Sequence, residues 1–183
     1  MVRILDGIKR YALGNRYRRG GNGYLRRTIA GWNRAATRTP FIVLTDLDSG
    51  ECAPQLLSGW LPFPKHPNLL FRVAVREVES WLLADPVNLA RFLGVPKSLM
   101  PAMPDMIDNP KGALVNIARK SRSRDIRERI APRVGSTAQQ GPDYNGCLGY
   151  FVRSRWDFGA AQANSPSLAR TVRRLSSFVP RWT

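Results

Sequence analysis

The sequence has few of the residues that build disulfide-bonded or metal-bound frameworks. Its 183 residues include two cysteines, Cys52 and Cys147, and a single histidine, His66. Two cysteines cannot form a disulfide framework, and with one histidine they do not supply the ligands of a structural zinc site. These shortages exclude the disulfide-rich secreted domains and the small zinc-binding modules.

Long hydrophobic runs are also missing. No stretch of about 18 apolar residues is present, although a membrane-spanning helix needs one. The first residues, MVRILDGIKRYALG, lack the uninterrupted apolar segment of a signal peptide. Hydrophobic residues still make up 43% of the chain, which is enough for a folded core. We therefore expect a soluble cytoplasmic domain that makes no membrane contact.

Negative charge is scarce, with 13 acidic residues against 29 basic ones and a net charge of +16. A genome that favours arginine codons explains such an excess, and so does a polyanionic partner. The basic residues are clustered, because residues 16–38 hold seven arginines and no acid, and a helical segment at 111–129 is also rich in arginine. The clustering favours nucleic acid as the partner. The side chains that we expect to contact its phosphates are Arg18, Arg19, Arg26, Arg27, Lys111, Arg119 and Arg122.

Hydrophobic patterning predicts an α/β fold. Apolar residues with helical spacing predict a helix at 24–36, and continuous apolar runs at 41–45 and 69–75 predict two buried parallel strands. A short helix at 54–61 joins the strands into a βαβ unit. Residues 1–95 are expected to form a small Rossmann-like parallel sheet with its helices, and residues 96–183 a helical extension of the same single domain.

The few acids gather near this predicted sheet. Asp46 and Asp48 directly follow the first strand, and Glu77 and Glu79 follow the second. The carboxyl ends of parallel strands meet at one edge of a sheet, and carboxylate oxygens are good ligands for Mg²⁺ or Mn²⁺. The pattern predicts a metal site formed by Asp46, Asp48 and Glu79, with Glu77 as the alternative ligand. The structural alternative is that the aspartates form a turn and the glutamates lie on a solvated helix face.

At these residues the chain resembles a Toprim-like prokaryotic family of unknown function, related to nucleases of phage defence and of the overcoming-lysogenisation-defect type. The resemblance rests on FIVLTDLD at 41–48, RVAVREVESWLLAD at 72–85, NPK at 109–111 and GPDYN at 141–145. It implies a Toprim-like core with Mg²⁺-dependent phosphodiester chemistry on nucleic acid, and an ATPase as a partner protein. Asp46 and Asp48 would be the metal-binding pair, and Glu79 a further catalytic carboxylate.

The chain departs from the Toprim pattern at its beginning. Toprim domains place a glutamate after their first strand, but the only acid before Asp46 is Asp6, in a segment with a helical pattern. We therefore expect that this chain lacks an N-terminal strand of the family, and that it shows little or no nuclease turnover without that strand.

Two other functions remain open at this stage. In a phosphatase of the haloacid-dehalogenase type, Asp46 would be the nucleophile and Asp48 the acid. In a non-catalytic nucleic-acid-binding module, the acids would be structural. A nuclease assay with and without Mg²⁺ distinguishes the module from the nuclease, and a small phosphomonoester substrate distinguishes the phosphatase.

Overall fold

The structure is a computed structural model that describes residues 1–17, 21–47 and 52–182. The chain is a mixed α/β protein with a two-stranded parallel sheet, as predicted, and much of the remainder is helical. It forms two compact units, one made of Met1–Val75 with Arg170–Thr183 and the other of Arg76–Ala169. The sequence pattern predicted that the α/β core ends near residue 95. In the structure, the unit that contains the sheet ends at Val75 and also includes the C-terminal segment that begins at Arg170.

The elements of the first unit follow one another as α1 (Val2–Ile8), α2 (Gly21–Ala35), β1 (Phe41–Asp46), α3 (Ala53–Trp60) and β2 (Leu69–Ala74). The second unit holds α4 (Val78–Leu83), α5 (Pro86–Leu93), the 3-10 turns η1 (Lys97–Leu99) and η2 (Pro104–Met106), α6 (Pro110–Arg119), α7 (Arg124–Ile130), α8 (Tyr144–Ser154) and α9 (Phe158–Ala161). Helix α10 (Pro166–Ser176) begins in the second unit and ends in the first.

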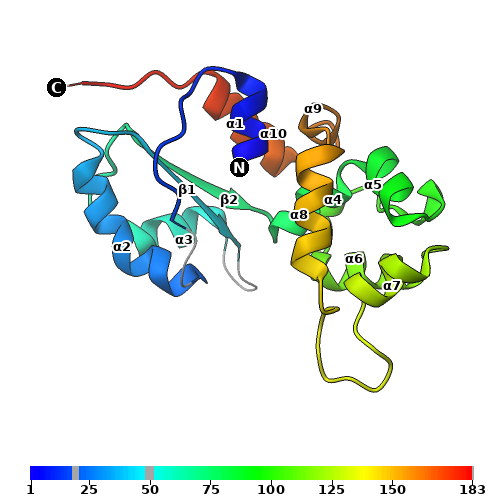
Figure 1. The fold of residues 1–183 in the computed structure, drawn as a ribbon. Helices are drawn as coiled ribbons and strands as arrows, with labels where there is room; N and C mark the ends of the chain where they lie inside the picture. The colour runs from blue at the N-terminus through cyan, green and yellow to red at the C-terminus, as the bar shows by residue number, and fades with distance from the viewer. Residues whose placement is uncertain (18–20, 48–51, 183) are drawn as a thin grey trace. The chain divides into compact units, whose positions relative to one another are not determined.

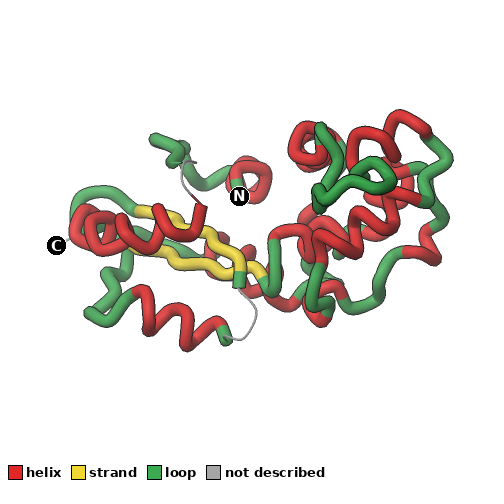
Figure 2. Tube along the Cα trace, turned by 90° about the horizontal axis from the view of Figure 1, so that it is seen from below, coloured by secondary structure: helices red, strands yellow, loops and turns green. Residues whose placement is uncertain are grey.

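The two predicted strands are confirmed. They run side by side (Figure 2), and their parallel register joins Phe41 to Leu69 at one end and Asp46 to Ala74 at the other. Because their residues are largely apolar on both faces, the strands need helices on both sides. Figure 1 shows α2 and α3 on one side of the sheet and α1 with the end of α10 on the other.

Helix α2 covers the sheet through the predicted apolar stripe. Ile29 and Trp32 are buried together with Val43 of β1 and Phe71 of β2. The arginines of this helix lie off the stripe and are exposed. The helix begins at Gly21, three residues before the predicted start.

Local capping signals set the helix boundaries of the second unit. The Asp85 carboxylate accepts a hydrogen bond from the backbone N–H of Asn88 at the start of α5, and Gly94 ends this helix in the left-handed region at φ 66°. Asn109 caps α6 in the same manner through the N–H of Gly112. Proline occupies the first turn of both helices, where its missing N–H costs nothing.

The basic segment at 111–129 is divided between two helices. Helix α6 ends at Arg119, and α7 begins at Arg124. The physical reason is Ser123, whose hydroxyl accepts a hydrogen bond from the N–H of Ile126 and so starts a new helix. Within the part of the chain that the structure describes, no helix is long and apolar enough to cross a membrane.

Candidate functional site

The predicted metal-binding residues fall in different parts of the chain. Asp46 is the last residue of β1, is half-buried and belongs to the first unit. Asp48 lies outside the described residues. Glu77 precedes the first turn of α4 and Glu79 lies within it, so both belong to the second unit.

In the second unit, Glu79 is the centre of a buried polar cluster. This residue is only 7% exposed, although it carries a carboxylate. The phenol of Tyr144 donates a hydrogen bond to its Oε1 at 2.9 Å, and the Lys111 ammonium nitrogen lies 3.9 Å from the same oxygen. A buried carboxylate needs such partners, because burying an isolated charge is expensive. The alternative of a solvated helix face is therefore wrong for Glu79.

Glu77 is tied to the same helix start. Its Oε2 accepts a hydrogen bond of 2.8 Å from the backbone N–H of Lys111, in the first turn of α6. A carboxylate at this place is stabilised both by the free N–H groups and by the helix dipole. The structure thus brings together Glu77, Glu79 and Lys111, two expected carboxylates and one residue expected to bind phosphate.

Tyr144 completes this cluster, and the sequence analysis assigned it no role. Burial raises the pKa of its phenol, and the negative charge and hydrogen bond of Glu79 raise this pKa further. The phenol therefore stays protonated and acts as a donor to the carboxylate. The GPDYN motif at 141–145 contains Tyr144 and is the sequence signal for this residue. It supports only the Toprim-like resemblance and gives Tyr144 no role of its own.

A close backbone crossing positions Tyr144 at the start of α8. The N–H of Gly141 donates to the carbonyl of Ile130 at 2.8 Å, and the N–H of Asp143 donates to the carbonyl of Arg129 at 3.0 Å. A Cβ atom on Gly141 would lie only 2.4 Å from the Arg129 carbonyl oxygen. Glycine is therefore required here by the approach of two backbone segments.

The cluster of Glu77, Glu79 and Lys111 carries a net negative charge, because it combines two carboxylates with one ammonium group, and such a charge attracts a divalent cation. Among residues 1–17, 21–47 and 52–182, no group of three or more His, Cys, Asp or Glu side chains is placed to hold a metal ion. Mg²⁺ does not require such a group, since it is commonly bound by one or two carboxylates together with water and substrate phosphates. A pair of carboxylates, completed by water and substrate phosphates, is therefore enough to bind Mg²⁺.

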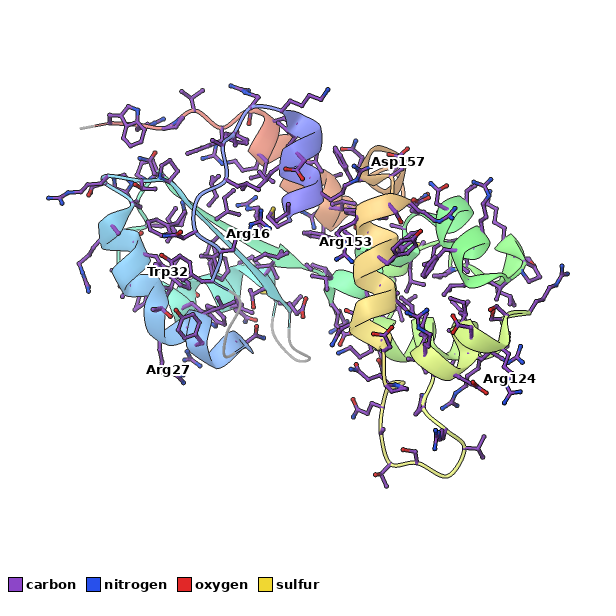
Figure 3. The ribbon with its side chains drawn as sticks, in the orientation of Figure 1. Arg16, Arg27, Trp32, Arg124, Arg153 and Asp157 are labelled. Carbon is purple, nitrogen blue, oxygen red and sulfur yellow. The ribbon has the colours of Figure 1, made fainter. Side chains whose placement is uncertain are left out.

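The expected phosphate-binding arginines lie in different environments. Arg26 and Arg27 are exposed on α2, where Figure 3 labels Arg27, and Arg119 is exposed at the end of α6. Arg122 lines an open pocket of about 600 Å³ together with Arg91. Arg18 and Arg19 lie outside the described residues.

Charge is divided unequally between the two units. The first unit carries 16 basic and four acidic residues, which gives a net charge of +12. The second carries 13 basic and nine acidic residues, which gives +4. Several arginines of the second unit are paired, as where Arg129 contacts Asp125 at 3.1 Å and Asp143 at 2.6 Å. The excess positive charge of the protein therefore belongs mainly to the first unit.

Comparison with known proteins adds no relationship to these observations. No family model matches the chain, and neither a curated protein nor a solved structure matches it. The Toprim-like relationship therefore stays a prediction that depends on the sequence motifs.

Proposed function

We propose that this protein binds nucleic acid and carries out Mg²⁺-dependent phosphodiester chemistry with a Toprim-like, Rossmann-like core, in the manner of a nuclease of phage defence. Asp46 and Asp48 are the proposed metal-binding pair. In the second unit, Glu79 contacts Tyr144 and Lys111, and Glu77 positions the start of α6, so neither glutamate is part of the proposed metal pair.

The observation that carries the proposal is the place of Asp46. It ends a buried strand that runs parallel to its neighbour, at the carboxyl edge of the sheet. Ligand and metal sites of open α/β sheets form outside this edge. An aspartate there, followed by a second one two residues later, supplies oxygen ligands of the kind that Mg²⁺ prefers.

The charge of the first unit supports nucleic acid as the substrate. A net charge of +12 attracts a polyanion over a distance of about one Debye length, which is about 8 Å at physiological salt. Arg26 and Arg27 are exposed on α2 and are therefore accessible to a polyanion. Contacts of this kind read no base sequence, so we expect affinity that depends strongly on salt.

The test measures metal binding and nucleic-acid cleavage in the same variants. Calorimetry with Mn²⁺ should show binding to the wild-type protein and none to the Asp46→Asn, Asp48→Asn double variant. Because Asp6 is the only acid before Asp46, cleavage of labelled DNA and RNA by this chain should be weak. The cleavage that occurs should require Mg²⁺ and should be lost in the same variant. Asp6→Asn, which removes an exposed acid from α1 of the same unit, is the matched control. Equal Mn²⁺ affinity in the wild type and the double variant would refute the metal pair.

One observation favours a second candidate, a non-catalytic nucleic-acid-binding module. The carboxylates of Glu77 and Glu79 both bond to protein groups, as structural acids do. For such a module, the Asp46→Asn, Asp48→Asn variant would bind oligonucleotides with the same salt dependence as the wild type. Addition of Mg²⁺ to the wild type would cause no cleavage.

A further inference from the structure

The first unit contains a pocket that the sequence analysis did not indicate. It has a volume of about 350 Å³, and its lining residues are Pro67, Arg174, Ser177, Val179 and Arg181. Two guanidinium groups and a hydroxyl are the hydrogen-bond donors of this lining, and it includes no acidic residue. Arginine is well suited to phosphate, because its planar donors match the phosphate oxygens in pairs.

The walls of the pocket are fixed by side chains from distant parts of the unit. Asn68 is fully buried, and its amide exchanges two hydrogen bonds of 2.8 Å with the backbone N–H and carbonyl of Arg181. The Tyr11 hydroxyl donates to the carbonyl of Leu175, at the end of α10. The Arg174 guanidinium lies 5.7 Å from the ring centre of Phe178, within range of a cation–π contact. The backbone at Arg181 and the guanidinium of Arg174 are therefore held in place before any ligand arrives.

Two more cations lie within electrostatic range of Arg174. Burial lowers the pKa of Lys65, and repulsion by Arg174 and Arg72 lowers it further. Burial and the charge of Arg174 likewise lower the pKa of Arg72, on β2. The hydrogen bonds of these two side chains go to backbone carbonyls, such as that of Leu69 at 3.0 Å from the Lys65 nitrogen. An anion beside Arg174 would relieve this mutual repulsion.

We propose that the pocket lined by Arg174, Ser177 and Arg181 binds a phosphate monoester dianion, with Lys65 and Arg72 adding to its positive field. This proposal rests on the proposed nucleic-acid function for the source of the phosphate, which is the terminal phosphate of a nucleic-acid strand. Free inorganic phosphate offers the same chemistry and is the other source.

The dianion fits the pocket better than an internal phosphodiester does. A monoester carries up to two negative charges and three terminal oxygens, whereas a diester carries one charge and two such oxygens. The two guanidinium groups of the lining compensate the larger charge, and three donor side chains match the larger number of oxygens. A pocket of about 350 Å³ also holds the end of a strand, whereas a continuous strand needs an open groove.

The experiment compares two short 3′-labelled oligonucleotides that differ only in a terminal phosphate or hydroxyl at the opposite end, by fluorescence anisotropy. Wild-type protein should bind the phosphorylated probe about tenfold more tightly, which is about 1.4 kcal/mol. The Arg174→Gln, Arg181→Gln double variant should lose this preference. Both side chains are exposed, so we expect the variant to fold. Arg173→Gln removes one positive charge, half of what the double variant loses, from an exposed neighbouring position of α10, and should weaken both probes equally.

A second titration, with inorganic phosphate alone, separates this proposal from the proposed function. Phosphate binding that the double variant loses supports the pocket even if neither oligonucleotide binds, in which case free phosphate is the source and the nucleic-acid function fails. Equal affinity of the wild type for both oligonucleotides, or a preference that survives in the double variant, overturns the terminal-phosphate proposal. Absence of phosphate binding to the wild type overturns the pocket itself.

Discussion

Replacing Gly141 by alanine tests how Tyr144 and the Glu79 cluster are positioned. The added Cβ would lie 2.4 Å from the carbonyl oxygen of Arg129 and 2.7 Å from the carbonyl carbon of Ile130. Real Cβ atoms essentially never approach a heavy atom to within 3.0 Å, so the two backbone segments must separate by about 0.6 Å. Both neighbours are backbone atoms, and neither can move away as the end of a flexible side chain would.

The cost of Gly141→Ala follows from this displacement. Overpacking of a fixed site costs about 1–3 kcal/mol. Separation of the segments also weakens the two hydrogen bonds from Gly141 and Asp143 to the end of α7, each worth about 0.5–1.5 kcal/mol. We therefore expect the free energy of unfolding to fall by about 2–5 kcal/mol.

Urea denaturation followed by circular dichroism measures this change. Gly149→Ala is the control, because it lies on the same helix, α8, and its Cβ would meet only the end of the Arg153 side chain at 3.2 Å. A difference of less than about 0.5 kcal/mol between the two variants would show that the backbone crossing does not constrain the fold.

Three other substitutions test the contacts described above. Tyr144→Phe removes a hydrogen bond to the buried Glu79 carboxylate and should cost about 1.5–3 kcal/mol in urea denaturation; an unchanged midpoint would contradict this bond. Asn68→Ala leaves buried backbone groups without their partner and should cost about 2–4 kcal/mol, whereas a loss below about 1 kcal/mol would mean that water replaces the amide. Arg129 lowers the pKa of Asp143, so the stability from this pair is present above the unfolded pKa of about 3.9 and is lost as pH falls through the lower folded pKa. Arg129→Gln should therefore unfold with a weaker dependence on pH below about 4, and identical acid titrations of the two proteins would exclude the pair as a source of acid sensitivity.

Local signals in the sequence were enough to predict much of the fold. The apolar runs predicted both strands. The Asp85–Pro86 and Asn109–Pro110 pairs are local signals of the same kind for the starts of α5 and α6, because a cap and a proline act within one helical turn. The start of α7 has a weaker signal, since its serine cap lies inside a basic helical pattern.

The candidate sites were harder to predict because they depend on distant pairs of residues. Lys111 was expected to bind phosphate, yet its backbone N–H and its ammonium group contact Glu77 and Glu79, more than 30 positions earlier. The pocket lined by Arg174, Ser177 and Arg181 also depends on a distant pair, because Asn68 bonds to Arg181, 113 positions later in the sequence. Neither contact produces a repeating pattern in the sequence from which it could be predicted.

The return of residues 170–182 to the first unit has a consequence for the order of folding. The second unit is continuous in the chain, so it can form its contacts without the residues that follow Ala169. The first unit must wait, because Tyr11 finds the carbonyl of Leu175 only after 164 further residues have been added. Such distant pairing slows folding, because a long loop must close before the contact stabilises it. Until residues 170–182 pack against the first unit, the amide of Asn68 and the face of the sheet beneath α10 remain exposed, so the chain should be most sensitive to proteases and to aggregation before this step.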